Sequence, residues 1–361
     1  MLDYSYDMSK RFFWRVGDDI FYNKFDALNQ SIKTNAPLKF HMFEEAFDTY
    51  DWTKEPEETW DEILRQRAQQ IRDSYSYIRL WYSGGADSHT ILRTFMKNNI
   101  PLDEIIMMRH SPFDDFTTLA DTEINDVAFS FIRTMRPELG NTKIHILDIG
   151  HKEYDEYSKR DFYATGCFNF KPISFREIYG LMPKELELKG DSHCEIRGYE
   201  KPRLFMEGNL FYSTMYDSTN GHYAIGDYRL ESFYTTEAMP KVHIKQSHLL
   251  KNHLKRQYKV TCAKDLERID RENYDLKPHI NNSCRYPLWK EITLGKGGSD
   301  GPPPKEEIIL NDDRMKNSII RSRYFSMMNE IDHSPLKEHC NNNNVFKNFK
   351  GILSKKYCLG S

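Results

Sequence analysis

Apolar residues between positions 57 and 149 switch repeatedly between the helical and the strand period. Three segments have apolar residues at helical spacing, which predicts helices: 57–72, 91–96 and 117–135. Three short apolar runs have the length of buried strands: 77–82, 104–108 and 143–149. Because strands and helices alternate along this stretch, we predict an α/β fold. Its core would be a doubly wound parallel sheet, with helices on both faces.

Beyond residue 150 this alternation stops, and the sequence contains other kinds of segment. Residues 203–217 have the pattern of a β-hairpin, with Gly208 and Asn209 in the turn. Residues 237–256 have helical spacing. Two segments are predicted to be loops: the Gly- and Pro-rich run 295–305 and the asparagine tract 341–344.

The chain has 361 residues and is longer than a typical single domain. The patterns divide it into three predicted parts: an N-terminal helical or irregular segment (1–75), an α/β domain (76–235) and a mostly helical C-terminal region with a Gly/Pro loop (236–361). The loop 295–305 is either a lid over a site or an exposed surface loop.

Composition narrows the class of protein. No apolar run approaches the roughly 18–20 residues that span a bilayer, and the N-terminus lacks the basic and apolar regions of a secretory signal. We therefore expect a cytoplasmic protein without membrane contact. The six cysteines are widely spread and form no CxxC pair, which favours free thiols over disulfides or a zinc site.

Charge is nearly balanced, with a formal net charge of −3, but its distribution is uneven. Residues 241–259 contain six Lys or Arg and three His without a single acid. Such a run is either a solvated helix face or a binding surface for anions, including the phosphates of a nucleotide or a nucleic acid.

The segment SGGADS (83–88) lies between the first predicted strand and the helix that follows it. A turn of this kind directs several backbone N–H groups at one point, and the helix N-terminus adds about half a positive charge. Phosphate is therefore the expected ligand. Gly84 and Gly85 allow the backbone to approach closely, and the hydroxyls of Ser83 and Ser88 can donate hydrogen bonds to phosphate oxygens.

Asp87 has the wrong charge for direct contact with phosphate. Its presence predicts either a bridging Mg²⁺ ion or a hydrogen bond that shapes the loop. No Lys follows the glycines, so the segment differs from the Walker sequence GxxxxGK[ST]. A tight turn without a ligand is the alternative interpretation.

SGGADS matches the SGGxDS signature of the PP-loop ATP pyrophosphatases, and residues 77–150 resemble that superfamily in strand and helix spacing as well. Its members include asparagine synthetases, GMP synthetases, tRNA-modifying adenylases and phosphoadenosine-phosphosulfate reductases. The resemblance implies a parallel sheet with ATP across the strand ends and cleavage between the α and β phosphates. It places adenine near Met108 and Arg109. It assigns the pyrophosphate portion of ATP to five residues: Ser83, Gly84, Gly85, Asp87 and Ser88.

The segment CEIRGYEKPRLF (194–205) resembles the stretch that lines the nucleotide pocket in the phosphosulfate-reductase-like branch. Arg197, Lys201 and Arg203 lie close in sequence to Gly198, and such a group of cations can neutralise phosphate charge. A surface hairpin with scattered cations is the alternative.

These features predict an enzyme that binds ATP and Mg²⁺ and adenylates a small-molecule or nucleotide substrate. A carboxylate, amide or base oxygen would attack the α-phosphorus, and an amine or ammonia from a separate donor would displace AMP. We expect Asp87, Lys201 and Arg203 to carry catalysis, with Asp87 as the metal ligand. Modification of a nucleic-acid base through the run 241–259 belongs to the same prediction.

Two other functions stay open. A redox or sulfur enzyme of the phosphosulfate-reductase type would need Cys358, although the terminal sequence KKYCLGS differs from the Glu-Cys-Gly motif of that family. A nucleotide-binding protein without catalysis would keep the loop and lack turnover.

Overall fold

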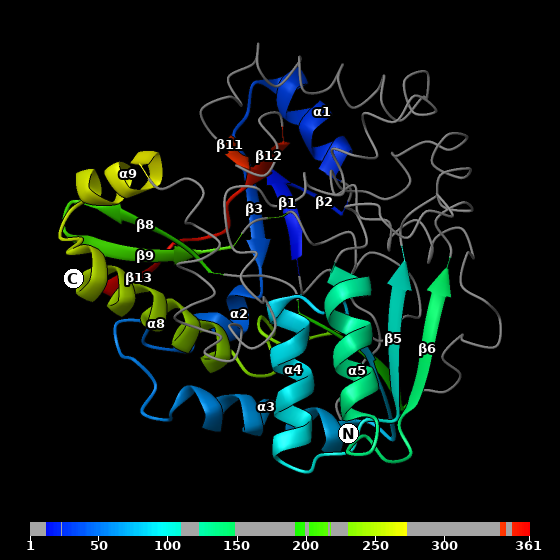
Figure 1. Ribbon diagram of the computed structural model, residues 1–361. Helices are drawn as coiled ribbons and strands as arrows, with labels where there is room; N and C mark the ends of the chain where they lie inside the picture. Colours follow the sequence, from blue (N-terminus) through cyan, green and yellow to red (C-terminus); the bar gives the residue numbers. More distant parts are fainter. Residues whose placement is uncertain are drawn as a thin grey trace.

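A parallel sheet of five strands forms the centre of the computed structural model (Figure 1). The structure describes residues 12–22, 24–109, 123–148, 192–198, 202–215, 217, 230–272, 340–343 and 349–361. The central strands, in spatial order, are β10 (Leu230–Ser232), β7 (His193–Arg197), β4 (Tyr77–Trp81), β5 (Glu104–Arg109) and β6 (Lys143–Asp148). All neighbours in this sheet are parallel, so the predicted α/β class is confirmed.

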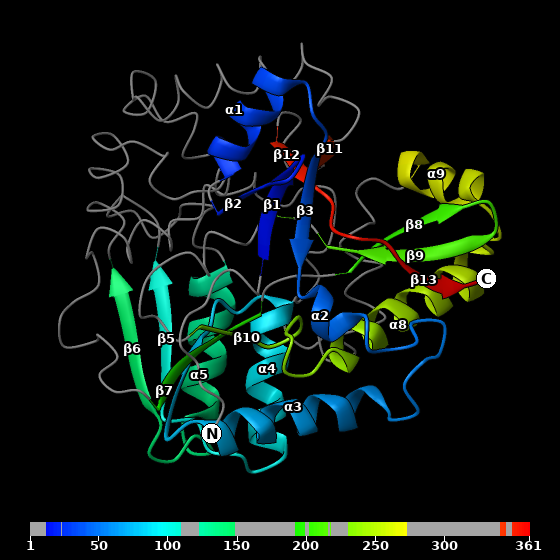
Figure 2. The same ribbon diagram turned by 180° about the vertical axis from the view of Figure 1, so that it is seen from behind.

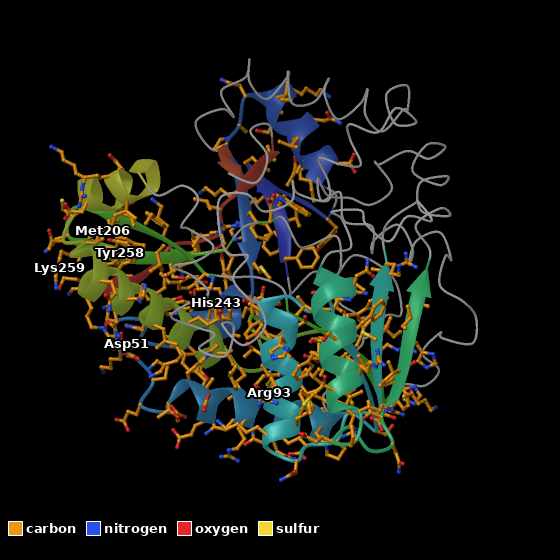
Figure 3. The ribbon with its side chains drawn as sticks, viewed as in Figure 1. Asp51, Arg93, Met206, His243, Tyr258 and Lys259 are labelled. Carbon is orange, nitrogen blue, oxygen red and sulfur yellow. The ribbon has the colours of Figure 1, made fainter. Side chains whose placement is uncertain are left out.

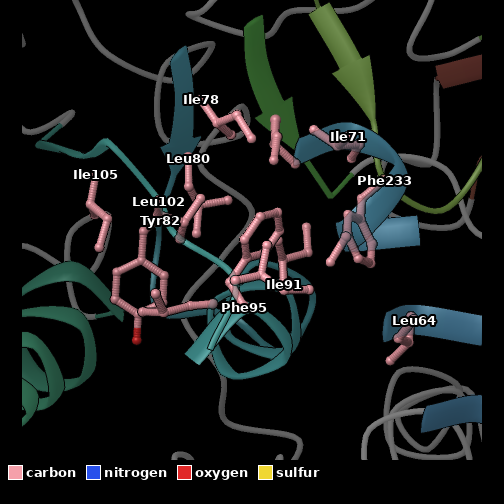
Figure 4. Packing of buried hydrophobic residues seen from close by; sticks show 14 of the residues in the cluster. Leu64, Ile71, Ile78, Leu80, Tyr82, Ile91, Phe95, Leu102, Ile105 and Phe233 are labelled. Carbon is pink, nitrogen blue, oxygen red and sulfur yellow. The ribbon is translucent and has the colours of Figure 1, made fainter. Parts of the chain in front are cut away.

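Helices cover one face of this sheet: α3 (Trp60–Ser74), α4 (Ala86–Lys97), a π-helical turn η3 (Glu123–Ala128) and α5 (Phe129–Met135). Their apolar side chains share a core with alternate residues of the strands. Figure 4 shows Leu80 and Tyr82 packed near Ile91 and Phe95 of α4. The three helices and three strands predicted between residues 57 and 149 are thus present where the structure describes them, and the layer of helices is confirmed for this face. Residues 117–122 of the third predicted helix lie outside the described residues.

The N-terminal part contains strands as well as helices. The strands β1 (Phe12–Val16), β2 (Asp19–Phe21) and β3 (Leu38–Met42) form an antiparallel sheet in the order β2-β1-β3. It is accompanied by α1 (Lys24–Thr34) and the short α2 (Glu44–Phe47). Phe12, Trp14 and Val16 are buried at alternate positions of β1, which is the strand period in a segment expected to be helical or irregular.

A third sheet joins the middle of the chain to its C-terminus. It consists of β8 (Arg203–Glu207), β9 (Leu210–Thr214) and β13 (Tyr357–Gly360) in the order β13-β9-β8. The hairpin β8–β9 has Gly208 and Asn209 between its strands, as predicted, and Gly208 has a φ of +61°. Two helices lie beside this sheet: α8 (Lys241–Tyr258) and α9 (Ala263–Glu272).

The loop predicted for the asparagine tract 341–344 is wrong for residues 341–343, which belong to a strand, and residue 344 lies outside the described residues. Strand β11 (Cys340–Asn343) pairs antiparallel with β12 (Phe349–Ile352). Asparagine has a weak preference for strands, so the local sequence favoured a loop. Backbone pairing with the partner strand overrides that preference. The Gly/Pro run 295–305 lies outside the described residues.

The basic run 241–259 lies on α8, and much of it faces the interior. Three of its lysines have partners within the chain: Lys241 with Glu58 at 2.6 Å, Lys245 with Glu55 at 2.7 Å, and Lys251 with the carbonyl of Leu359 at 2.7 Å. Lys255, Arg256 and Lys259 at the end of α8 are exposed. Figure 3 shows Lys259 at the opposite end of α8 from His243, pointing away from α4. Anion binding by this run therefore stays a prediction for its last turn.

No helix in the described parts of the chain combines the length and the apolar character needed to cross a membrane. Cys194, Cys262 and Cys358 are free thiols.

Candidate nucleotide-binding site

The SGGADS loop (residues 83–88) follows β4 where the strand order reverses. From β4 the chain continues to β5 and β6 on one side, whereas β7 and β10 lie on the other side. In parallel α/β sheets, ligands bind outside the carboxyl ends of the two strands at such a reversal. Those strands here are β4 and β7, so the SGGADS loop and Gly198 follow the two strands that border the expected site.

Figures 1 and 2 show this edge of the sheet from opposite sides. In both views the arrowheads of β5 and β6 point toward the part of the molecule that contains α1 and β1–β3. Because β4 and β7 run parallel to β5, their carboxyl ends share this edge. The N-terminal sheet is therefore on the side of the molecule that would hold a ligand.

Hydroxyl groups determine the shape of the loop. The Ser88 hydroxyl accepts a hydrogen bond from the backbone N–H of Ser83 at 3.2 Å and lies 3.2 Å from the Ser83 hydroxyl. It also donates to the carbonyl of Gly85 at 3.2 Å, and the Gly85 N–H donates to the Ser83 hydroxyl at 3.3 Å. The two serines predicted to contact phosphate thus hold the turn together by side-chain bonds to its backbone.

The backbone of the loop is suited to an anion. Gly84 has a φ of +82°, a left-handed conformation that glycine adopts without steric cost. Helix α4 begins at Ala86, and the N–H of His89 donates to the carbonyl of Gly85 at 3.0 Å. The N–H groups of the first three helical residues precede that bond, so they have no acceptor within the helix. Together with the positive end of the helix dipole, they favour an anion at this position.

The segment after β7 passes so close to the loop that a side chain at Gly198 would crowd its neighbours. A Cβ atom at Gly198 would lie 3.0 Å from the Cβ of Asp87 and 3.3 Å from atoms of Ile91 and Tyr234. Gly198 and Asp87 are therefore neighbours across the strand-order reversal, although more than a hundred positions separate them in the sequence. The two segments that we identified separately in the sequence, 83–88 and 194–205, therefore meet at this point.

Tyr234, two residues after β10, supports the loop from the other side of β7. It follows β10, is fully buried, and donates its hydroxyl to the backbone carbonyl of Asp87 at 2.8 Å. Its ring stacks on Trp60 of α3 with the centroids 6.3 Å apart. The first turn of α4 is thereby attached to both α3 and β10.

The residues predicted to contact adenine lie at the same edge. Met108 and Arg109 end β5, the strand next to β4, and both are buried. Met108 packs with three apolar neighbours on the face opposite the helices: Trp81, Ile106 and Leu147. Their position agrees with the fold-based expectation, and contact with adenine stays a prediction.

The cations predicted to form one group near Gly198 lie in different parts of the structure. Arg197 is buried on β7, where it forms an ion pair with Glu195 at 3.1 Å. Arg203 is exposed and belongs to β8, which is not part of the sheet that precedes the SGGADS loop. Lys201 lies outside the described residues. Contact of these side chains with phosphate stays a prediction.

Buried charges occupy the face of the sheet opposite α4. Arg79 on β4 pairs with Glu104 on β5 at 2.6 Å and with Glu195 on β7 at 3.0 Å. Glu195 also accepts hydrogen bonds from Arg197 and from the indole N–H of Trp81. The Arg197 guanidinium lies 5.0 Å from the centroid of the Trp81 ring. Each buried charge thus has an opposite charge beside it, which burial requires.

A buried histidine directly follows the loop. His89 is fully buried on α4, and its Nδ1 lies 3.0 Å from the hydroxyl of Tyr82. Its Nε2 has no hydrogen-bond partner among the described residues. Burial, together with the positive charge of Arg93, lowers the pKa of His89 to about 4. The imidazole is therefore neutral at neutral pH.

In comparisons with known proteins, no family model, no curated protein and no solved structure matches this chain. The functional interpretation therefore depends on the loop, its position in the sheet and the residues around it.

Sequence reasoning missed Tyr234, Trp81 and Glu195. No motif surrounds Tyr234, so only its contact with Asp87 identifies it. A signal for Glu195 was present: charged residues occupy alternate positions within an otherwise apolar strand, as Glu195 and Arg197 do in β7. Such alternation in a strand expected to be buried predicts charges that pair across the sheet.

Proposed function

We propose that this protein is an ATP-dependent adenylating enzyme with a doubly wound PP-loop fold. ATP would bind with its pyrophosphate portion at the SGGADS loop, and a carboxylate, amide or base oxygen of the substrate would attack the α-phosphorus. The products would be an adenylated substrate and pyrophosphate, and an amine or ammonia would then displace AMP. The substrate class is a small molecule or nucleotide, including a base of a nucleic acid.

One observation carries this proposal. The SGGADS loop connects the central strand β4 to α4 at the strand-order reversal, and Gly198, the residue after β7, lies directly against Asp87. A glycine-rich turn at a helix N-terminus in this place offers backbone N–H groups to a phosphate chain. The match of the segment to the SGGxDS signature supports the assignment of that anion as ATP.

The residues present fit Mg²⁺ as a partner of ATP. Asp87 is half-buried in the first turn of α4 and offers a carboxylate beside the loop. In nucleotide sites Mg²⁺ is typically held by one or two carboxylates and the substrate phosphates, so a single acid suffices. The described residues contain no group of three His, Cys, Asp or Glu side chains suited to a metal. When bound with ATP, Mg²⁺ would neutralise phosphate charge.

The chain's own residues would act mainly by orientation. The hydroxyls of Ser83 and Ser88 hold the loop in a turn, and in the complex they would donate to phosphate oxygens. Gly198 lets β7 approach Asp87, and Tyr234 fixes the carbonyl of Asp87. A preorganised site of this kind needs little rearrangement when charge develops on the leaving pyrophosphate.

Ser83→Ala and Asp87→Ala should each weaken binding of ATP with Mg²⁺ by roughly ten- to a hundredfold. Hydrogen bonds to charged groups contribute about 1.5–3 kcal/mol, which corresponds to that range of Kd. Isothermal titration calorimetry at fixed salt and Mg²⁺ measures the effect.

Two matched variants separate binding from stability. Asp61 is an acid in the first turn of α3, as Asp87 is in α4, and Asp61→Ala should leave the Kd unchanged. Ser76 precedes the amino end of β4, whereas Ser83 follows the carboxyl end, and Ser76→Ala should be equally silent. Wild-type affinity in both loop variants would contradict the assignment of the loop.

A further inference from the structure

The carboxyl ends of β4 and β7 are connected by one buried carboxylate. Glu195 on β7 is fully buried and accepts hydrogen bonds from Arg79 at 3.0 Å, from Arg197 at 3.1 Å and from the indole N–H of Trp81. Trp81 is the last residue of β4, two positions before Ser83. Arg197 is the last residue of β7 and directly precedes Gly198.

The bond from Trp81 to Glu195 extends the connection between the two strands one residue beyond the backbone pairing. The paired register of β4 and β7 runs from Tyr77 opposite His193 to Leu80 opposite Ile196. Beyond that pair, one chain turns into the SGGADS loop and the other continues to Gly198. The side chains of Trp81 and Glu195 join the two strands at this point, so the spacing of the strand ends depends on them as well as on the backbone ladder.

That spacing matters because Gly198 lies directly beside Asp87 of the loop. A Cβ at Gly198 would already be 3.0 Å from the Cβ of Asp87, which is closer than side chains normally pack. Because Gly198 has no side chain, the segment after β7 and the first turn of α4 lie close together at this point. A change in the bond between Trp81 and Glu195 moves the segment that directly precedes the loop.

We propose that Glu195 is a positioning residue for the SGGADS loop, which it orders through the indole N–H of Trp81. The loop, held in this way, presents its backbone N–H groups in one arrangement to an anion. The consequence for ATP affinity rests on the proposed function, whereas the ordering of the loop does not. A charge cluster that served global stability alone would not act selectively on residues 82–88.

The chain offers close controls for Trp81→Phe, which removes the indole N–H and keeps an aromatic ring beneath Arg197. Trp52→Phe is the same substitution at another buried tryptophan, whose indole donates to the carbonyl of Phe47 at 2.9 Å. Tyr77→Phe removes a hydroxyl that donates to Glu104 at 3.1 Å, on the same strand but at its amino end.

The experiment measures amide hydrogen exchange by mass spectrometry, together with the melting temperature and the Kd for ATP with Mg²⁺. In Trp81→Phe, exchange in peptides covering 82–88 should accelerate by roughly ten- to a hundredfold relative to the wild type. In Trp52→Phe and Tyr77→Phe the same peptides should exchange at the wild-type rate, even where the melting temperature falls.

The outcomes separate this inference from the proposed function. Unchanged exchange at 82–88 in Trp81→Phe, or acceleration there no larger than in the rest of the sheet, overturns the positioning role. Selective acceleration supports it whether or not the wild type binds ATP. If the wild type binds ATP, Trp81→Phe should also weaken binding by about tenfold. If it does not, the proposed function fails and the positioning role stands on the exchange data.

Discussion

Replacing Arg79 by Met is expected to lower the free energy of unfolding by about 3–5 kcal/mol. Arg79 is 2% exposed and lies between two buried carboxylates, 2.6 Å from Glu104 and 3.0 Å from Glu195. Methionine fills a similar volume but leaves both acids without this counter-charge. Removing one partner from a buried ion pair is costly because the remaining charge has lost its hydration without compensation.

Lys97→Met is the matched control. Its ammonium lies 2.6 Å from the Asp61 carboxylate, as close as Arg79 lies to Glu104, but both of these side chains are more than 60% exposed. Exposed ion pairs contribute about 0–1 kcal/mol, so the free energy of unfolding of this variant should be close to that of the wild type. Chemical denaturation of all three proteins measures the difference. Equal stability of the Arg79→Met and Lys97→Met variants would show that the buried cluster contributes nothing to folding.

The protein should lose stability on acidification between pH 6.5 and pH 4, and His89 should account for about 3 kcal/mol of that loss. Burial, with the positive charge of Arg93, lowers the pKa of His89 from its ordinary 6.5 to about 4. Below pH 6.5 the unfolded chain binds a proton at this imidazole that the folded chain excludes. The stabilisation is therefore complete above pH 6.5 and disappears as the pH falls to about 4.

His89→Gln isolates this contribution, because glutamine does not titrate and all other groups stay the same. The free energy of unfolding of the wild type and the variant should be compared at several pH values from 7 to 4.5. The wild-type curve should fall more steeply, by up to about 1.4 kcal/mol per pH unit. Parallel curves would mean that His89 is not held neutral by its surroundings.

The fold could be predicted best where the structure of a segment depends on residues close together in the sequence. The alternation of helix and strand periods between residues 57 and 149 predicted the order of elements, because each buries one regular face. SGGADS lay correctly between a strand and a helix, since glycine and a first-turn acid both have local structural reasons to be there. The turn at Gly208 and Asn209 followed from the same kind of short-range rule.

What sequence reasoning missed depends on pairing between distant segments. Strand β1 was not predicted, because its alternating Phe12, Trp14 and Val16 are a short pattern whose partners β2 and β3 come later. The sequence analysis also did not predict the residues that contact Arg197. Its cationic side chain suggested a phosphate ligand, whereas it pairs with Glu195 on its own strand and lies over the ring of Trp81 on the neighbouring strand β4. The alternation of Glu195 and Arg197 in β7 was a local sign of such pairing, but it does not identify every partner of the cation.

Product analysis tests the central claim most directly, since it separates adenylation from mere nucleotide binding and from other ATPases. ATP labelled on the α-phosphate, and in a parallel sample on the γ-phosphate, is incubated with the protein, Mg²⁺ and a small-molecule cell extract as the source of substrate. Asp87→Ala serves as the blank. The account predicts label in AMP or an adenylated product in the first sample and in pyrophosphate in the second. Release of ADP and orthophosphate, or no cleavage above the Asp87→Ala blank, would contradict it.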